Sequence, residues 1–577
     1  MLINATVRKE SDLDDARDTL LKTVEEFASH PPTQKEVEDA RADLLKPIDL
    51  ALSDSGQIGL TLSNYIGYGD WRMLFLERDR YKQVTPHDVV RVAGKYLKPS
   101  NRTVALFIPT EKPDRSEIPP PTDISATFKD YKGGAAIAQG DAFDPSPENI
   151  DKRTIRGNLG SGMKLVMVPK KTRGETVNAE IVLHMGDQQS LMGREMDGLV
   201  AASLLMRGTT KHTRQQITDE FNRLKAQVNV LGGGTSTARA TIETTRANLP
   251  EVLKLVAEIL REPAFPEKEF EQYKQQQLAN AENARREPQV IARVGLYQHL
   301  IPYPKGDFRH VMSPDETIED LKNFKLDEAK KFYREFYGAS YGEFVVVGDF
   351  DAETTQKLAS DLFGDWKTPK PHQHILYPFQ PVPAVNQSIK TPDKANASIM
   401  LGMTIDIGDE HPDYPAMVVG NYILGSGTNS RLFQRVRGKE GLSYGVGSQF
   451  LGRGKEESGI FFSFAIYAPQ NVNKVESAVR EELARVLKDG FTDEEVAAAK
   501  KGWLQSRVVS RSQDRELLGQ LSSFAYEDRR MSRAADLERM VQALTPGQIV
   551  EAMRRHLDLA RLSVFKAGDY DKAGVTP

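Results

Sequence analysis

The sequence repeats one order of elements three times, and this repetition restricts the folds that the chain can adopt. Each copy contains a helix with an acidic start, a second capped helix further along, and then a strand. The copies begin at His30, Ala264 and Gly490. Equivalent points of the two helices lie 52, 59 and 53 residues apart, measured from Thr33 to Thr85, from Pro266 to Lys325 and from Thr492 to Thr545. Because three ordered copies are hard to explain as coincidence among amphipathic helices, the sequence predicts tandem homologous domains.

Local signals mark where the second helix of each copy begins and where its strand follows. Thr85 and Thr545 are good N-caps, since each precedes a proline and has Asp or Gln three residues on. The predicted strands are RTVALFIP from Arg102, YGEFVVVGDF from Tyr341 and RLSVFKAGD from Arg561. Each copy is therefore expected to end in a strand.

Two proline-rich segments divide the chain. Residues 111–150 contain EIPPPTD and DAFDPSPEN, which predict an acidic, extended linker. Residues 371–387 overlap the stretch KTPKPHQHILYPFQPVPAV, whose prolines exclude a central strand, and are predicted to form a hinge linker. Complete domains are expected over residues 151–370, opening with the strand MKLVMVPKK, and over residues 388–571.

Residues 1–110 contain only the second half of this plan. They open with INATVRK, which is equivalent to FFSFAIYAP in the last copy. Residues 3–9 are therefore predicted to form a strand whose sheet lacks several neighbours. Open sheet edges and uncovered apolar faces are normally covered in soluble proteins. We expect this half domain to be the least stable part of the isolated chain and to pair with a second polypeptide or with a missing N-terminal region.

One stretch combines two side chains suited to peptide chemistry. In GSGTNSRLFQRVRGKEGLSYG, residues 425–445, a turn leads into a short basic helix and a second turn. Arg437 and Tyr444 lie seven residues apart with two glycines between them. A guanidinium fork and a phenol brought together there could bind a peptide carbonyl or stabilise the oxyanion formed from it. On spacing alone, a solvated helix face that carries Arg431, Arg435 and Arg437, beside a half-buried strand tyrosine at 444, is the favoured interpretation.

The stretch SRLFQRVRGKEGLSYGV resembles the signature of the C-terminal domains of the insulinase/pitrilysin family, inverted-motif zinc peptidases with relatives in mitochondrial processing peptidase. The resemblance extends from Ile3 to Asp569, and includes MKLVMVPKKTRGETVNAEIVLH and SIKTPDKANASIMLGMTI. It implies an α+β fold of tandem metallopeptidase-homology domains, with antiparallel sheets covered by helices, forming one half of a clamshell. It also implies that Arg437 and Tyr444 reach substrate and that the zinc-bearing first domain of the family is missing here.

The zinc ligands of that family are absent from this sequence. Its site is His-x-x-Glu-His on a helix with a further Glu on a later helix, and none of the ten histidines has this spacing. The equivalent positions are occupied by Leu199, Ala202, Ser203 and Asn280. We therefore expect residues 151–370 to be a degenerate domain, with no metal bound by this chain and no peptidase activity by the chain alone. Zinc is expected in the complete assembly.

Two functions remain open. The first is the substrate-binding portion or partner subunit of a zinc endopeptidase that encloses peptides, with zinc and general base supplied elsewhere. The second is a non-catalytic peptide-binding or scaffold protein of the same family. A net charge of −4 does not indicate nucleic-acid binding, and no apolar run is long enough to span a bilayer. The absence of cysteine excludes thiolate sites but leaves periplasm and cytoplasm open.

Other motifs carry weaker signals. His372 and His374 could share a strand face as a metal pair, but without a nearby carboxylate they are interpreted as solvated linker residues. The glycines at 232–234 predict a turn, because no nucleotide-loop Lys follows them. Ser522 has no matching His and Asp pattern for a triad. The charge runs RREP and EDRR are interpreted as solvated helix faces.

Overall fold

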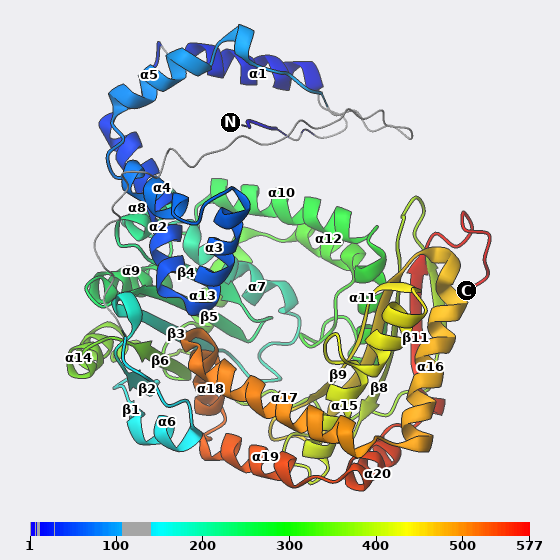
Figure 1. Ribbon diagram of the computed structural model, residues 1–577. Coiled ribbons are helices and arrows are strands. Elements are labelled where there is room, and N and C mark those ends of the chain that lie inside the picture. The colour runs from blue at the N-terminus through cyan, green and yellow to red at the C-terminus, as the bar shows by residue number, and fades with distance from the viewer. Residues whose placement is uncertain (1, 6, 8–11, 28, 107–139) are drawn as a thin grey trace. The chain divides into compact units, whose positions relative to one another are not determined.

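The computed structural model describes residues 2–5, 7, 12–27, 29–106 and 140–577 (Figure 1). The chain forms two compact units. The first comprises the described residues up to Gly140 together with Thr172–Thr176 and Thr218–Gln227, and the second comprises the remainder. Most of the predicted linker 111–150 lies outside the described residues. Among the described helices, none has the length and apolar character needed to cross a membrane.

The first unit is built from helices. They are α1 (Leu13–Glu26), α2 (Gln34–Ser53), α3 (Ser55–Gly67), α4 (Met73–Tyr81) and α5 (Pro86–Tyr96), followed by the 3-10 turn Pro99–Asn101. The predicted cap at Thr85 is confirmed, because its side chain and that of Asp88 form a reciprocal capping box. Thr33 caps α2 in the same way with Glu36.

The strand predicted over residues 3–9 is wrong for the part of it that the structure describes. Residues 3–5 and 7 form no strand, and residues 6, 8 and 9 lie outside the described chain. Residues 102–106 of the predicted strand RTVALFIP are also irregular, and its remainder is not described. A strand needs neighbours to pair its backbone groups, and the described residues of the first unit before Gly140 form no strand that could supply them.

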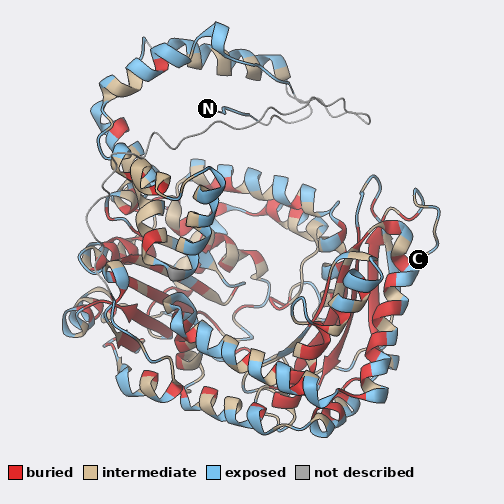
Figure 2. Cartoon of the chain, viewed as in Figure 1, coloured by how far each residue is buried: buried red, intermediate tan, exposed pale blue. Residues whose placement is uncertain are grey.

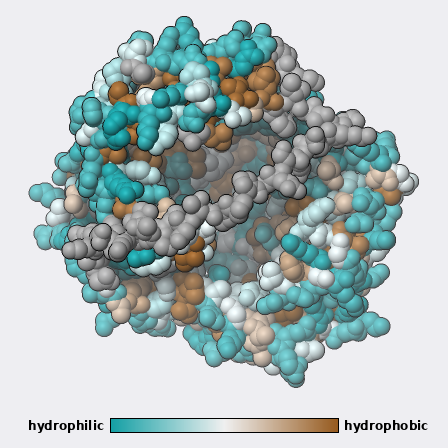
Figure 3. Space-filling view, turned by 45° about the horizontal axis from the view of Figure 1, so that its top comes forward, coloured by the Kyte–Doolittle hydropathy of each residue, from teal (hydrophilic) through white to brown (hydrophobic). Residues whose placement is uncertain are grey.

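As a result the helices of the first unit expose apolar side chains. Figure 3 shows apolar residues at its surface among hydrophilic ones. The exposed large side chains of its helices and turns are Leu44, Leu60, Ile66, Tyr68, Trp71, Val92 and Tyr96. Helix α1 buries none of its side chains, and α5 buries only Ala93. An apolar surface of this kind is typical of a contact face for another polypeptide.

The second unit contains two sheets, and the first is six-stranded with the order β1-β2-β6-β3-β5-β4. Strands β2 and β6 are parallel, whereas β1–β2 and β6–β3 are antiparallel. Its strands are β1 (Ile155–Asn158), β2 (Lys164–Pro169), β3 (Thr176–His184), β4 (Gln227–Gly232), β5 (Thr237–Thr245) and β6 (Gly342–Gly348). Its helices are α6 (Pro147–Arg153), α7 (Glu195–Leu204), α8 (Arg214–Arg223), α9 (Leu249–Arg261), α10 (Glu267–Ala284), α11 (Pro288–Leu300), α12 (Pro314–Asn323), α13 (Leu326–Phe336) and α14 (Ala352–Phe363).

The second sheet is five-stranded with the order β7-β11-β8-β10-β9. Its strands are β7 (Asn386–Lys390), β8 (Ala397–Ile405), β9 (Ser443–Gly452), β10 (Gly459–Tyr467) and β11 (Ser563–Gly568). Its helices are α15 (Tyr414–Gly425), the π-helix η5 (Phe433–Lys439), α16 (Val472–Asp489), α17 (Asp493–Ser512), α18 (Asp514–Tyr526), α19 (Ser532–Ala543) and α20 (Pro546–His556). Short 3-10 turns occur at Arg173–Glu175, Leu205–Arg207, Pro469–Asn471 and Leu559–Arg561.

The expected α+β class is confirmed, but each sheet has one parallel pair where only antiparallel pairing was expected. These pairs are β2–β6 and β7–β11. In the second sheet the last strand, β11, pairs with the first strand, β7, at the sheet edge. In the first sheet the last strand, β6, pairs with β2, and β1 lies outside β2 at the edge. Helices α15, α16 and α20 bury the second sheet's main core, which appears as buried strands in Figure 2.

The two halves of the second unit exchange one helix each. Helix α18 belongs to the C-terminal half, yet its Leu517 and Leu521 pack with Val166 and Val345 of the first sheet. Helix α11 belongs to the preceding half, yet it packs on the second sheet (Figure 1). There Ala292, Leu296 and Leu300 contact a cluster that includes Met400 and Phe565.

The contact of α11 with the second sheet is close enough to require glycine. A Cβ atom added to Gly295 would lie 2.6 Å from the ring of Phe565. A larger residue at 295 would push the helix away from the sheet. The reciprocal exchange therefore depends on the sequence at both the helix and the strand.

Candidate functional site

Arg437 and Tyr444 are adjacent in the structure. Arg437 lies on the π-helix η5, a form that often occurs at functional sites. The chain then reverses at Gly441, whose φ of 62° favours glycine. The guanidinium of Arg437 donates a short hydrogen bond to the backbone carbonyl of Tyr444. The seven-residue spacing thus closes into one loop that holds both side chains.

A β-bulge sets the direction of the Tyr444 side chain. Along the β9–β10 pair, Gly445 is opposite Ile466 and Ser443 is opposite Tyr467, so Tyr444 is the extra residue between them. Bulges of this kind re-aim a side chain and are frequent beside active sites. Tyr444 is 60% exposed. The alternative of a half-buried strand tyrosine is therefore wrong.

The three arginines of the basic helix have different surroundings. Arg431 donates to Glu495 at 2.7 Å, and this carboxylate raises the pKa of Arg431. Arg435 pairs with Glu440 at 2.9 Å and is also bonded to Glu481. In the described part of the chain, Arg437 alone of the three lies beyond ion-pair distance of any carboxylate. The prediction of a solvated arginine face is therefore wrong for Arg431 and Arg435. Among the described residues, no carboxylate neutralises the positive charge of Arg437.

The four positions equivalent to the family's zinc ligands lie on α7 and α10. Ala202 is fully buried, and the hydroxyl of Ser203 donates to the carbonyl of Leu199 at 2.8 Å. Asn280 is exposed and accepts a hydrogen bond from Gln276 at 3.1 Å. None of these side chains offers an imidazole, a thiolate or a carboxylate. The set does not fit a zinc ion.

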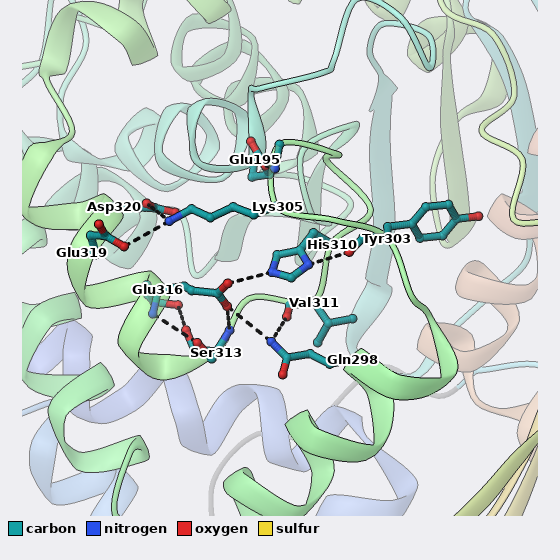
Figure 4. Close-up of polar contacts among 12 residues, drawn as sticks. Glu195, Gln298, Tyr303, Lys305, His310, Val311, Ser313, Glu316, Glu319 and Asp320 are labelled. Carbon is teal, nitrogen blue, oxygen red and sulfur yellow. Dashed lines mark hydrogen bonds and ion pairs between the residues drawn. The ribbon is translucent and has the colours of Figure 1, made fainter. Parts of the chain in front are cut away.

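A polar network fixes the loop between α11 and α12 (Figure 4). His310 contacts the carbonyl of Tyr303 at 2.8 Å and Glu316 at 3.1 Å. Glu316 also accepts from the amide of Ser313 at 2.7 Å and from Gln298 at 3.3 Å. Burial alone would raise the pKa of Glu316, but the Ser313 and His310 hydrogen bonds hold it below its usual range. Because Gln298 of α11 is bonded to Val311 and to Glu316 of α12, this network is best explained as a brace for the exchanged helix α11.

The second proline-rich linker contributes to another polar cluster. The prediction of a solvated residue is wrong for His372, which is half-buried, whereas His374 is exposed as predicted. His372 lies 3.2 Å and His374 lies 3.0 Å from the hydroxyl of Tyr526, on α18. His184, on β3, stacks on the Tyr526 ring with centroids 4.1 Å apart. Burial raises the pKa of Tyr526 to about 12, so its hydroxyl keeps its proton.

Carboxylates that the sequence did not reveal complete this cluster. Glu343, on β6, lies 2.7 Å from the Nε2 atom of His184, and Glu456 lies 2.9 Å from the Nε2 atom of His374. The residues come from both sheets, the linker and α18, and only the His-x-His spacing could have indicated them. The cluster therefore joins the two halves of the second unit at the linker.

We expect the stability of the second unit to fall between pH 6.5 and pH 4 because of His372. Burial, with the neighbouring His184, lowers the pKa of His372 to about 4. An unfolded chain takes up this proton near pH 6.5, so acidification favours unfolding over that interval and has no such effect above it. After allowance for partial exposure, the loss is about 2 kcal/mol.

Urea unfolding at pH 7.0 and pH 4.5 measures this loss. The variant His372→Gln removes the titrating group, so its decrease in unfolding free energy should be smaller by that amount. His87→Gln, in the first unit, is the matched control and should behave like the wild type. Equal decreases in wild type and His372→Gln would contradict the assignment.

The remaining motifs are structural. Glycines 232–234 form the predicted turn, in which Gly233 donates to the carbonyl of Thr237 at 2.8 Å. Ser522 is buried in α18. In the run EDRR, Asp528 and Arg530 are exposed as predicted, but the Arg529 side chain is only 10% exposed and lies 2.7 Å from both Glu410 and Glu527. It anchors the end of α18 to the loop before α15.

Comparison with known proteins identifies the segment that carries this loop. Residues 323–502 match the family described as the peptidase M16 inactive domain. This segment is similar to M16 inactive domains. It contains Arg437 and Tyr444, and it confirms the resemblance to the insulinase/pitrilysin peptidases.

Relatives of the M16 domain have mixed descriptions. An uncharacterized zinc protease of Rickettsia bellii is 25% identical over 329 residues, covering 56% of this chain and 76% of that protein. The Helicobacter pylori protein described as non-peptidase homolog YmxG is 22% identical over 331 residues, covering 57% of this chain and 74% of that protein. This chain thus resembles one protein that is described as a zinc protease and another that is described as a non-peptidase homolog.

Solved structures support the same fold. An M16 inactive domain from Pseudomonas fluorescens has a TM-score of 0.64 and 25% identity, and covers 72% of this chain and 97% of its own. The periplasmic protease PqqL from Escherichia coli has a TM-score of 0.58 and 13% identity, and covers 96% of this chain and 63% of its own. The second match shows the fold alone, across almost the whole chain.

Proposed function

We propose that this chain is the substrate-binding portion of an M16-type zinc endopeptidase, whose zinc and general base come from another region or a partner subunit. One contrast carries the proposal. The positions equivalent to the zinc ligands hold Leu199, Ala202, Ser203 and Asn280, whereas Arg437 and Tyr444 form an exposed donor pair. A portion that had lost all function would have no need to keep that pair accessible.

The donor pair has defined chemical abilities. The guanidinium of Arg437 uses one nitrogen on the Tyr444 carbonyl, which leaves further N–H donors in a fixed planar fork. The Tyr444 hydroxyl adds an O–H donor on an exposed bulge. Together they would bind the carbonyl of a peptide and stabilise the oxyanion that forms when water attacks it. Zinc held by the partner would supply the activated water.

The second function is a non-catalytic peptide-binding or scaffold protein. It is favoured by the Helicobacter pylori relative that is described as a non-peptidase homolog. In that case the donor pair would hold peptides without cleaving them. The two functions differ in one measurable respect, which is hydrolysis in the presence of a zinc-bearing partner.

We expect the chain alone to cleave no peptide, and to enhance cleavage when mixed with the M16 homologue that carries His-x-x-Glu-His in the same genome. Fluorogenic peptide libraries measure the cleavage, and zinc content is measured for each protein separately. Hydrogen exchange should slow in α1–α5 on mixing, because their apolar faces become covered. Slowed exchange without enhanced cleavage would favour the scaffold function. Cleavage by the chain alone would contradict the proposal.

A further inference from the structure

Three metal-ligating side chains meet where α15 begins and α20 ends. His411 and Asp413 lie in the loop that leads into α15, and His556 is the last residue of α20. Each offers a ligand atom, and these atoms all lie within 4.8 Å of one another. The His556 side chain is only 7% exposed. No other group of three such residues occurs in the part of the chain that the structure describes.

The core of the domain, rather than the cluster itself, holds the three residues in place. Helices α15 and α20 approach so closely that a Cβ atom on Gly420 would lie 2.4 Å from the sulfur of Met553. Val419, Ile549 and Met553 are buried in the same core cluster. The loop and the helix end are therefore positioned before any ligand binds. Preorganisation of this kind favours binding, and lets the cluster be altered without unfolding the domain.

The surroundings of His556 match those of a metal-binding histidine. Its Nε2 atom lies 2.8 Å from an Asp413 oxygen, and its Nδ1 atom lies 3.5 Å from Asp406. Histidines that bind metal usually give their second N–H to a carboxylate. Asp406 lies within ion-pair range of Nδ1 and could accept that N–H after a small shift. With the proton on Nδ1, the Nε2 lone pair points to the same side as Asp413. Two tetrahedral zinc ligands are about 3.3 Å apart, so this pair would need to separate only slightly.

His411 closes the third side. Its ring is nearly perpendicular to that of His556, with centroids 5.2 Å apart. Its Nδ1 atom now accepts the backbone N–H of Asp413 at 3.1 Å. Metal coordination at this nitrogen would replace that single hydrogen bond. The exchange costs little, because a neutral hydrogen bond makes only a modest net contribution to stability.

We propose that His411, Asp413 and His556 bind one divalent transition-metal ion, with zinc preferred, which ties the start of α15 to the end of α20. Two imidazoles and one carboxylate are a ligand set suited to zinc. Water completes the tetrahedron. The ion stabilises the C-terminal domain by binding only its folded form.

Arg555 competes for this site. Its guanidinium is bonded to the Asp413 oxygen that also contacts His556. Its positive charge therefore lies close to the position that the metal ion would take. The Arg555 side chain is 59% exposed and can swing into solvent. Removing its charge should therefore strengthen metal binding, whereas a purely structural ion pair would only lose stability. Tighter metal binding after removal of the Arg555 charge would therefore indicate a metal site, whereas a loss of stability alone would indicate a structural ion pair.

The proposal revises the expectation of a metal-free chain. That expectation considered the family's ligand positions and the pair at 372 and 374. His411 and His556 are 145 residues apart, and only the packing of α15 on α20 brings them together. Sequence spacing carries no signal for such a site.

The full chain, purified without a histidine tag and stripped with a chelator, tests the proposal by titration with Zn²⁺ and Co²⁺. We expect one equivalent to bind, with the visible absorption of tetrahedral cobalt and a raised melting temperature. His556→Gln and Asp413→Asn should abolish saturable binding. Asp406→Asn should weaken it about tenfold, because it removes the carboxylate charge that faces the Nδ1 atom of His556. Arg555→Gln should tighten it about five- to tenfold.

Two controls keep the result interpretable. His372→Gln leaves the site intact and should bind like the wild type. Circular dichroism of each metal-free variant checks that the domain is folded, so that lost binding reports lost ligands. Absence of one-equivalent binding in both wild type and Arg555→Gln would overturn the proposal. Binding that survives in Asp413→Asn and His556→Gln would also overturn it, because the metal would then be held elsewhere.

Discussion

Arg437→Lys and Tyr444→Phe, each in the chain assembled with its zinc-bearing partner, should lower peptide turnover by about one to three orders of magnitude, as loss of an oxyanion donor does. Lysine keeps the charge of Arg437 but not the planar fork that bonds the Tyr444 carbonyl and that we propose also binds a substrate carbonyl. Phenylalanine removes only the hydroxyl, since the backbone bond to Arg437 remains. The fold should be unchanged, because both side chains are exposed.

Steady-state kinetics with a fluorogenic peptide measure this effect, with zinc occupancy of the partner determined for each variant. Lys439→Gln is the matched control, because it removes an exposed charge from the same π-helix and should leave turnover unchanged. A loss in kcat with little change in KM would indicate a role in the transition state. Wild-type kinetics in both variants would return Arg437 and Tyr444 to a structural role.

Leu521→Ala and Leu296→Ala should each lower the free energy of unfolding by about 2–5 kcal/mol. Both side chains are fully buried. Each lies on an exchanged helix, so each variant leaves a cavity against the other half's sheet. We therefore expect both halves of the second unit to lose stability together.

Urea unfolding followed by hydrogen exchange resolves this coupling. Val509→Ala, at an exposed position of α17, is the control and should change stability by less than about 0.5 kcal/mol. Faster exchange in β2 and β6 is expected for Leu521→Ala, and in β8 and β11 for Leu296→Ala. If hydrogen exchange became faster only in the half to which the mutated helix belongs in sequence, the swapped helices would not couple the stabilities of the two halves.

Local features of the fold could be predicted from sequence because they depend on neighbouring residues. The caps at Thr85 and Thr545 form as expected, with Asp88 and Gln548 completing each box. The strands YGEFVVVGDF and RLSVFKAGD form β6 and β11. The proximity of Arg437 and Tyr444 also has a local cause, since a glycine turn joins them.

Features that depend on distant partners could not be predicted. The apolar pattern of α18 shows that it has a buried face, but not that this face packs on a sheet more than a hundred residues earlier. The parallel pairing of β2 with β6 is a consequence of topology, not of either strand's sequence. His372 was interpreted from its linker alone, whereas Tyr526 and His184 determine its environment. The alternating pattern at residues 3–9 predicts a strand, but residues 3–5 and 7 are irregular, because strand formation also requires a partner strand.

The reciprocal exchange of α11 and α18 also affects how the protein is made. On the ribosome, β6 emerges with the outer face of the first sheet still uncovered, because α18 begins 166 residues after Gly348. At ordinary translation rates this delay is about 10–30 s. During that time Val166 and Val345 would lie on an unprotected apolar surface of the nascent chain. Chaperone dependence should therefore be concentrated in this interval, and synthesis that stops before α18 should yield an aggregating product rather than a soluble first half.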